Sequence, residues 1–89
     1  MQKYVKTYFD YFDYKVVEEI PCEACGKIPI ADVHHIRGRG EGMDTIKNLI
    51  GLCRKCHDRA HNSKHYVSKG EFQLIHNYFL TGARKQFLT

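Results

Sequence analysis

Four cysteines and a group of histidines are the residues of this chain whose types and spacing could do chemistry. The cysteines form two pairs with two residues between their members, Cys22 with Cys25 and Cys53 with Cys56. This spacing lets two sulfurs converge on one ion from a tight turn, and two such knuckles complete a tetrahedral zinc shell. Gly26 suits the left-handed turn that the first knuckle needs. A zinc ion with four cysteine ligands has no open position for a substrate, so we expect a structural ion.

Disulfides are the alternative use of four cysteines, with three possible connectivities. The first ten residues interleave aromatic and charged side chains and lack the apolar stretch of a secretory signal. We therefore expect a reducing, cytoplasmic setting, in which paired cysteines more often hold metal. No apolar run is long enough to span a bilayer, so we expect no membrane partner.

Four of the six histidines lie between and after the knuckles, namely His34, His35, His57 and His61. His57 and His61 are four residues apart on a predicted helix, which is ligand spacing. His34 and His35 are adjacent at the end of a predicted strand, where successive side chains alternate between faces. One of this pair can therefore ligate a metal while the other addresses a water. Asn48 precedes the second strand, where its carboxamide could orient a histidine or contribute a ligand.

The elements that must position these residues follow from the apolar pattern of one 89-residue domain. Aromatic residues recurring every fourth position predict an amphipathic helix in residues 1–20, which packs on the domain or contacts a second copy or DNA. We expect a strand over 28–36, a glycine-rich loop over 37–42 and a second strand over 49–52. A helix should begin near residue 53 and carry both His57 and His61.

A further helix is predicted over residues 68–82, C-terminal to the 22–61 core. Ser68 and Glu71 have the spacing of a capping box, and Gly82 is a plausible stop. Phe72, Ile75 and Phe79 share one face, which indicates a helix that covers the core.

Residues 32–36 (DVHHI), 48–52 (NLIGL) and 53–57 (CRKCH) together resemble the motif of the HNH endonucleases. The first cysteine pair matches the subgroup that builds its ββα-metal finger around a structural zinc, over roughly residues 22 to 61. The resemblance implies an α+β fold, a small zinc-stabilised, treble-clef-like finger flanked by N- and C-terminal helices. The histidines and Asn48 also resemble the metal site of colicin-type DNases, which lack the cysteine knuckles.

The resemblance assigns a role to each matching residue. His35 matches the general base that takes a proton from the attacking water, which suits a side chain that titrates near neutral pH. His34 and His57 match metal ligands, and His61 matches the third ligand of the colicin-like arrangement. Asn48 matches the residue that positions the base or the metal. Many members carry Asp where His34 stands, which leaves Mg²⁺, Mn²⁺, Ni²⁺ and Zn²⁺ as candidates for the catalytic ion.

The implied reaction is metal-dependent hydrolysis of DNA, leaving 5′-phosphate and 3′-hydroxyl ends. A net charge of +4 is compatible with a nucleic acid partner. The candidate phosphate contacts are Arg37, Arg39, Arg54, Lys55 and Arg59. Each of them is equally well explained as an ordinary solvated side chain. A second copy of the chain, or a phage or bacterial DNA-processing protein, is the expected protein partner. His65 and His76 lie outside the motif and receive no role.

Two other functions are compatible with the same sequence. One is a zinc-dependent DNA-binding or accessory module without catalysis, which leaves His35 and Asn48 without a purpose. The other is an interaction domain whose functional surface is the aromatic N-terminal helix.

Overall fold

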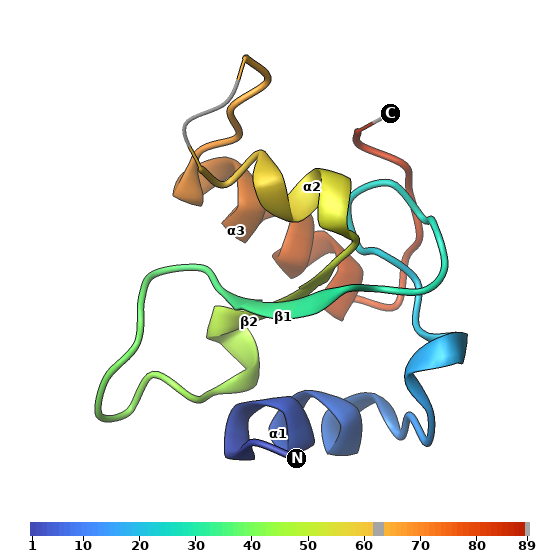
Figure 1. The fold of residues 1–89 in the computed structure, drawn as a ribbon, viewed down its shortest axis with the longest axis vertical. Helices are drawn as coiled ribbons and strands as arrows, with labels where there is room; N and C mark the ends of the chain where they lie inside the picture. Colours follow the sequence, from blue (N-terminus) through green and yellow to red (C-terminus); the bar gives the residue numbers. More distant parts are fainter. Residues whose placement is uncertain (62–63, 89) are drawn as a thin grey trace.

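A two-stranded sheet lies between helices on its two sides in the computed structural model, which describes residues 1–61 and 64–88 (Figure 1). The sheet is antiparallel and pairs β1 (Asp32–His35) with β2 (Leu49–Leu52). Helix α1 (Lys3–Phe12) lies on one side, and α2 (Arg54–Asp58) and α3 (Lys69–Leu80) lie on the other. Two short 3₁₀ turns complete the elements, η1 (Val17–Glu19) and η2 (Ile46–Asn48). This α+β arrangement confirms the predicted fold class.

Each face of the sheet has its own apolar core, because successive side chains of a strand point to opposite faces. Ile50 and Leu52 of β2 pack with the cysteines and with Phe72 and Ile75 of α3. Leu49 packs on the opposite face in a second cluster with residues of α1. All four residues of β2 are buried, which explains why this strand is apolar at successive positions.

The α1 side of the sheet is held by a buried polar network as well as by apolar contacts. The Tyr8 hydroxyl donates to Glu23 Oε2 at 2.6 Å, and the Gly51 backbone N–H donates to the same oxygen at 3.1 Å. His76 Nδ1 donates to the other oxygen, Glu23 Oε1, at 2.6 Å. Burial raises the pKa of Tyr8 far above its ordinary value, so its hydroxyl keeps the proton that it donates. This network ties α1, the first knuckle, β2 and α3 together.

Gly51 is required by this packing rather than by its backbone angles. A Cβ atom at this position would lie 2.5 Å from the Tyr8 hydroxyl oxygen and 3.3 Å from Ile30 Cγ2. No real Cβ atom tolerates the first distance, so any side chain at position 51 would displace α1 from the sheet.

The N-terminal helix is shorter than predicted, since α1 ends at Phe12 and not near residue 20. Asp13 adopts a left-handed conformation with φ 59°, and the Tyr14 N–H donates back to the Phe9 carbonyl at 2.9 Å. This cap ends the helix because left-handed geometry cannot continue it. Residues 17–19 then form the separate turn η1.

The first strand is also shorter than predicted, since β1 begins at Asp32 and not at Ile28. The Ile30 N–H donates to the Ile20 carbonyl, whereas the Ala31 N–H donates to the Leu52 carbonyl. Pro29 has no N–H to donate. Residues 28–31 therefore bond to different segments and do not form a ladder with a single partner strand. The second strand lies where it was predicted.

The helix after the second knuckle begins as predicted but carries only one of the two histidines. Helix α2 ends at Asp58, and the Ala60 and His61 N–H groups donate to the carbonyls three residues earlier. This tighter winding places His61 just beyond the helix.

The C-terminal helix confirms its predicted start and stop. Ser68 and Glu71 form the complete capping box, and Gly82, with φ 91°, follows shortly after the helix end. Phe72, Ile75 and Phe79 are buried, so this helix covers the core as expected. Within the described residues, no helix has the length and apolar character needed to cross a bilayer.

Candidate metal and catalytic site

The two cysteine pairs converge into one cluster, with all four sulfur atoms within 4.8 Å of one another. The first knuckle closes through Gly26, whose φ is 80° and whose N–H donates to the Cys22 carbonyl at 2.9 Å. A hydrogen bond between Cys22 and Cys56 lowers the pKa of Cys22 to about 4 and raises the pKa of Cys56, so these two thiols share a proton. Four soft sulfur donors gathered this closely fit a structural zinc ion.

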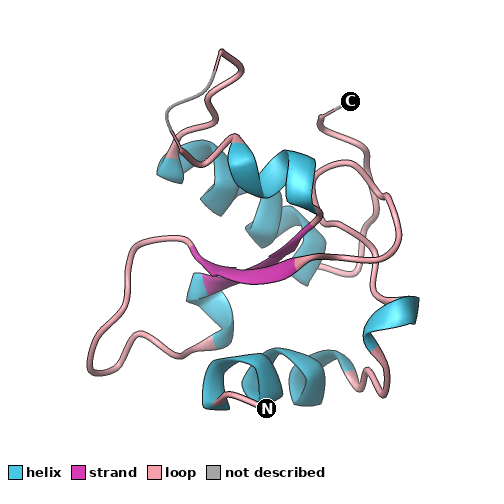
Figure 2. Cartoon of the chain, viewed as in Figure 1, coloured by secondary structure: helices cyan, strands magenta, loops and turns pink. Residues whose placement is uncertain are grey.

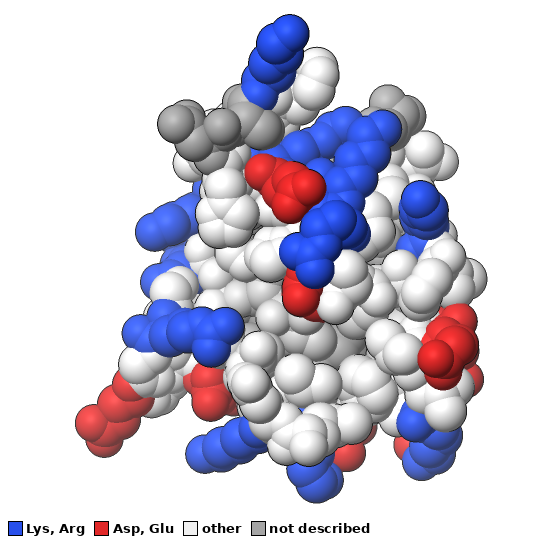
Figure 3. Space-filling model, viewed as in Figure 1, with Lys and Arg blue, Asp and Glu red and all other residues white. Residues whose placement is uncertain are grey.

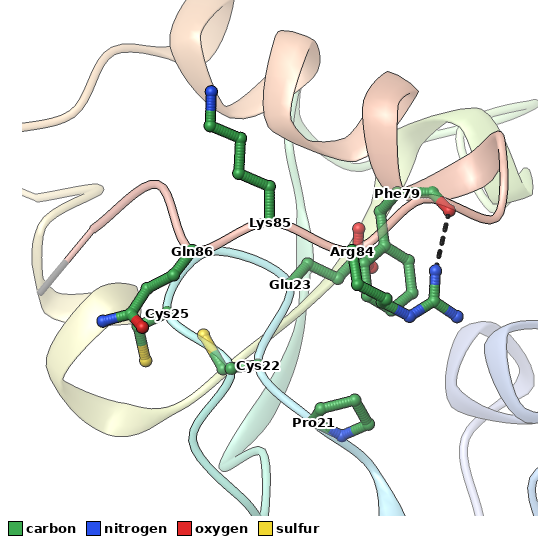
Figure 4. A pocket seen from close by; sticks show the side chains of 9 residues that line it. Pro21, Cys22, Glu23, Cys25, Phe79, Arg84, Lys85 and Gln86 are labelled. Carbon is green, nitrogen blue, oxygen red and sulfur yellow. Dashed lines mark hydrogen bonds between the residues drawn. The ribbon is translucent and has the colours of Figure 1, made fainter.

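The C-terminal segment packs over the first knuckle and closes this end of the molecule. The Phe87 N–H donates to the Ala24 carbonyl at 2.8 Å. Beside this contact lies a pocket of about 320 Å³, in which the Cys22 side chain faces the segment that follows α3 (Figure 4). Arg84 borders the pocket, with its guanidinium 3.8 Å from the Phe79 ring centroid and Nη1 donating to the Phe79 carbonyl at 3.3 Å. These contacts belong to the packing around the cysteine cluster.

The four histidines of the motif line one cavity of about 350 Å³. His34 and His57 lie 4.9 Å apart by ring centroids, His57 and His61 5.4 Å, and His34 and His61 6.3 Å. Although His34 and His35 point to opposite faces, both reach the cavity, because β1 is an edge of a two-stranded sheet. The other residues that line the cavity are Tyr4, Asp32, Val33, Gly38 and Arg39.

Asp32, the first residue of β1, orients one of these histidines. Its Oδ2 atom accepts from His57 Nδ1 at 2.8 Å and forms an ion pair with Arg54 Nη1 at 3.2 Å. A carboxylate on one ring nitrogen fixes the tautomer and leaves Nε2 with the lone pair that a metal ion binds. His57 is therefore prepared as an Nε2 ligand.

His34 is kept neutral by its surroundings. Burial, and then the neighbouring rings of His57, His61 and His35, lower the pKa of His34 to about 4. A neutral imidazole keeps a lone pair for metal binding at neutral pH. The grouping of His34, His57 and His61 thus has the donor chemistry of a divalent transition-metal site.

Among the described residues, the cysteines are the one set of three or more potential ligands whose donor atoms already converge. The three histidine rings are neighbours, but they do not form a comparably tight group. The two centres therefore differ in preorganisation: the sulfur atoms are gathered by the fold, whereas the histidine rings border an open cavity.

One ring nitrogen of His35 has a hydrogen-bond partner and the other does not in the described chain. Its Nε2 atom donates to Asp44 Oδ1 at 2.8 Å, and its Nδ1 atom is buried without a hydrogen-bond partner in the described chain. The Tyr4 ring packs on the imidazole with centroids 4.5 Å apart. A proton on Nε2 leaves the lone pair on Nδ1, so this atom is a proton acceptor. The ring is therefore fixed by Asp44 and keeps one acceptor nitrogen without a partner in the described chain.

Asn48 is buried beneath the loop that follows His35 and does not contact the ring itself. Its Nδ2 atom donates to the Gly38 and Met43 carbonyls at 3.1 and 2.9 Å, and its Oδ1 atom accepts from the Arg37 N–H at 2.8 Å. These bonds hold the long loop between the strands, which extends away from the body in Figure 2. Because that loop carries Asp44, Asn48 supports His35 through the loop.

The candidate phosphate contacts divide by location. Arg39 lines the histidine cavity with its guanidinium 5.1 Å from the Tyr4 ring centroid, and Arg54 borders the cavity through Asp32. Arg37 lines a different groove. Lys55 and Arg59 lie on or just after α2 and do not line the cavity. Figure 3 shows basic side chains gathered over the region of α2, with acidic side chains beside them.

Fold and site together define a small α+β finger with a cysteine cluster able to hold a metal and a separate histidine cavity. Residues 22–63, a little under half of the chain, match the family model of the HNH endonucleases. No curated protein and no solved structure matches the chain significantly. This match indicates nuclease-type activity with a metal as the general class of function.

Sequence reasoning missed the carboxylates that complete this site. Asp44 lies in the glycine-rich loop, nine residues after the histidine that it contacts, and no regular spacing connects the two. Asp32 stands two residues before His34, but its partner His57 is 25 residues away. Tyr4 was placed on a packing stripe, whereas its ring covers His35. The last two contacts form only when distant segments fold together.

Proposed function

We propose that the protein is a metal-dependent DNA endonuclease that hydrolyses phosphodiester bonds with His35 as the general base. The observation that carries this proposal is the environment of His35. One ring nitrogen is held by Asp44, the other is buried and unpartnered, and the same cavity contains three further histidines. A structural histidine would normally have both nitrogens satisfied, because a buried polar atom without a partner costs about 1–3 kcal/mol.

In this reaction, His35 Nδ1 takes a proton from a water molecule as the water oxygen attacks the phosphorus atom. The bond from phosphorus to the 3′ oxygen breaks, and the departing oxygen takes a proton from solvent water, which leaves a 5′-phosphate and a 3′-hydroxyl end. Asp44 keeps the proton on Nε2, stabilises the imidazolium that forms, and prevents the ring from turning. Asn48 holds the loop that presents Asp44.

His34, His57 and His61 are the residues that would hold the catalytic ion, with Asp32 fixing the tautomer of His57. When bound, a divalent ion such as Mg²⁺, Mn²⁺, Ni²⁺ or Zn²⁺ supplies Lewis-acid stabilisation of charge on the scissile phosphate and the departing 3′ oxygen. The nitrogen donors favour the transition metals over Mg²⁺, which prefers oxygen ligands.

The DNA contacts of this proposal are the basic side chains around the cavity. Arg39 lines the cavity, and Arg54 forms an ion pair with Asp32, which lines it as well. Lys55 and Arg59 extend the positive charge along and beyond α2. One His35 can act on one phosphodiester bond at a time, so cutting both strands requires a second copy of the chain or a second encounter. Cysteine ligands require a reducing setting, and the cytoplasm is the proposed place of action.

The test is cleavage of supercoiled plasmid by metal-depleted protein that retains its structural zinc, with each candidate ion added separately. We expect nicking that depends on the added ion and falls about 10³-fold in His35→Ala, the scale of a lost general base. His65→Ala, an exposed position outside the cavity, is the matched histidine control. Circular dichroism and zinc content establish that each variant is folded.

Two outcomes would contradict the proposal. Equal cleavage by His35→Ala and the wild type would remove His35 from the reaction. Absence of cleavage of plasmid, single-stranded and branched DNA with every ion, by folded protein that still binds DNA, would indicate a binding module without catalysis.

A further inference from the structure

A second groove, of about 560 Å³, lies between the loop that follows His35 and helix α3. It is lined by Arg37, Lys47, Gln73, Asn77 and Leu80. Three of these residues belong to α3, which follows the segment that matches the HNH family. The groove therefore joins the matched segment, which contributes Arg37 and Lys47, to a helix outside that segment.

The side-chain oxygen atoms of Gln73 and Asn77 already accept hydrogen bonds from other residues that line the groove. Arg37 Nε donates to Gln73 Oε1 at 3.3 Å. Gln73 Nε2 donates to the Lys47 carbonyl at 2.9 Å and to Asn77 Oδ1 at 3.1 Å. This chain of bonds also fixes the guanidinium of Arg37 against α3.

The donors that remain are cationic or neutral N–H groups. In residues 1–61 and 64–88, no hydrogen bond or ion pair engages the Arg37 terminal nitrogens, Lys47 Nζ or Asn77 Nδ2. No carboxylate lines the groove. A concave surface with two positive charges, a free amide N–H₂ group and engaged acceptors is complementary to an anion. Phosphate oxygens, which only accept, are suited to it.

We infer that this groove binds a backbone phosphate of the DNA, close to the bond that is cleaved, an inference that rests on the proposed nuclease function. Arg37 follows His35 by two residues, so their Cα atoms are at most about 7 Å apart. A DNA strand rises about 3.4 Å per nucleotide, so the bound phosphate lies within a few nucleotides of the reacting one. Asn48, which accepts from the Arg37 N–H, fixes the backbone between the two positions. Leu80 offers an apolar wall for the sugar.

The inference is tested by DNA binding, measured as fluorescence anisotropy of a labelled duplex without added divalent ion. His35→Ala is the background, so that cleavage cannot interfere. Lys47→Gln should reduce the slope of log affinity against log salt by about one, because one phosphate contact is lost. Asn77→Asp should lower affinity about tenfold, since it places a carboxylate where a phosphate would lie. Lys27→Gln, which removes an exposed charge near the first knuckle, is the matched control and should leave the slope unchanged.

Inorganic phosphate alone distinguishes the source of the anion. Millimolar phosphate could shift the NMR signals of the Gln73 and Asn77 side-chain amides while Lys47→Gln leaves the salt dependence of DNA affinity unchanged. That result would show that the groove binds free anions, and it would overturn the assignment to DNA. If neither the salt dependence of DNA affinity nor the amide signals change, the groove is not a phosphate site. That result is the one expected if the groove binds an acidic protein. If Lys47→Gln reduces the slope and the protein with His35 intact cuts no DNA with any ion, the groove is supported and the nuclease proposal fails.

Discussion

Two of the imidazole–carboxylate pairs in the described residues, His76 with Glu23 and His35 with Asp44, differ in what surrounds them. His76 donates from Nδ1 to Glu23 and contacts the Ile46 carbonyl through Nε2, and both side chains of the pair are fully buried. His35 donates to Asp44, which is about one-third exposed, while its other nitrogen has no partner in the described chain.

The two pairs differ in how many hydrogen bonds the imidazole ring makes within the protein. At His76 every polar atom of the ring has a protein partner, so the ring serves as a cross-link between α3, the first knuckle and η2. At His35 one buried nitrogen has no partner in the described chain, and the residue lines a cavity. The same chemical pair is therefore structural where all its bonds are made within the protein, and suited to catalysis where one is left open.

The largest effect on stability is expected from breaking the buried pair. Glu23→Gln leaves the His76 ring without its carboxylate and weakens the bonds from Tyr8 and Gly51. We expect a loss of about 3–5 kcal/mol in the free energy of unfolding, the scale of a broken buried ion pair. Urea unfolding at constant zinc measures it, with the exposed Glu18→Gln as control. A loss no larger than that of the control would show that the buried pair does not hold the fold.

A smaller effect, on activity and not on stability, is expected from the cavity pair. Asp44→Asn removes the charge that holds His35, and we expect a fall in kcat of about 10- to 100-fold with KM little changed. Glu41→Gln, an exposed carboxylate in the same loop, is the control. Steady-state cleavage of a short duplex separates kcat from KM. If Asp44→Asn raised KM alone, Asp44 would be assigned to DNA binding.

The smallest effect is expected from acid titration of His34. The folded chain keeps this ring neutral down to about pH 4, whereas an unfolded histidine titrates near about pH 6.5. Between these values the unfolded chain binds more protons, so stability falls as pH falls from about 6.5 to about 4. His34→Gln should lose less stability on acidification than the wild type. Identical pH dependence in the two proteins would contradict the depressed pKa, and NMR titration of the ring measures it directly.

Several features could be predicted because each is encoded by residues close together in the sequence. They are the cysteine knuckles, the second strand, the capped C-terminal helix and the histidine set. A CxxC pair, an apolar run and a capping box each depend on residues a few positions apart. The ends of α1 and of β1 were predicted less well, because a left-handed cap at Asp13 and competing backbone partners at Ile30 and Ala31 decided them.

The sequence by itself determined the kind of chemistry: cysteines at knuckle spacing, four histidines and an asparagine in the order of the HNH motif. Only the tertiary structure decided which histidine has an unpartnered nitrogen and which is locked. The partners that make this distinction, Asp44 for His35 and Glu23 for His76, are 9 and 53 residues away along the chain. Such contacts depend on the folding of the loop between the strands and on the packing of α1 and α3 about the sheet, and no local spacing encodes either.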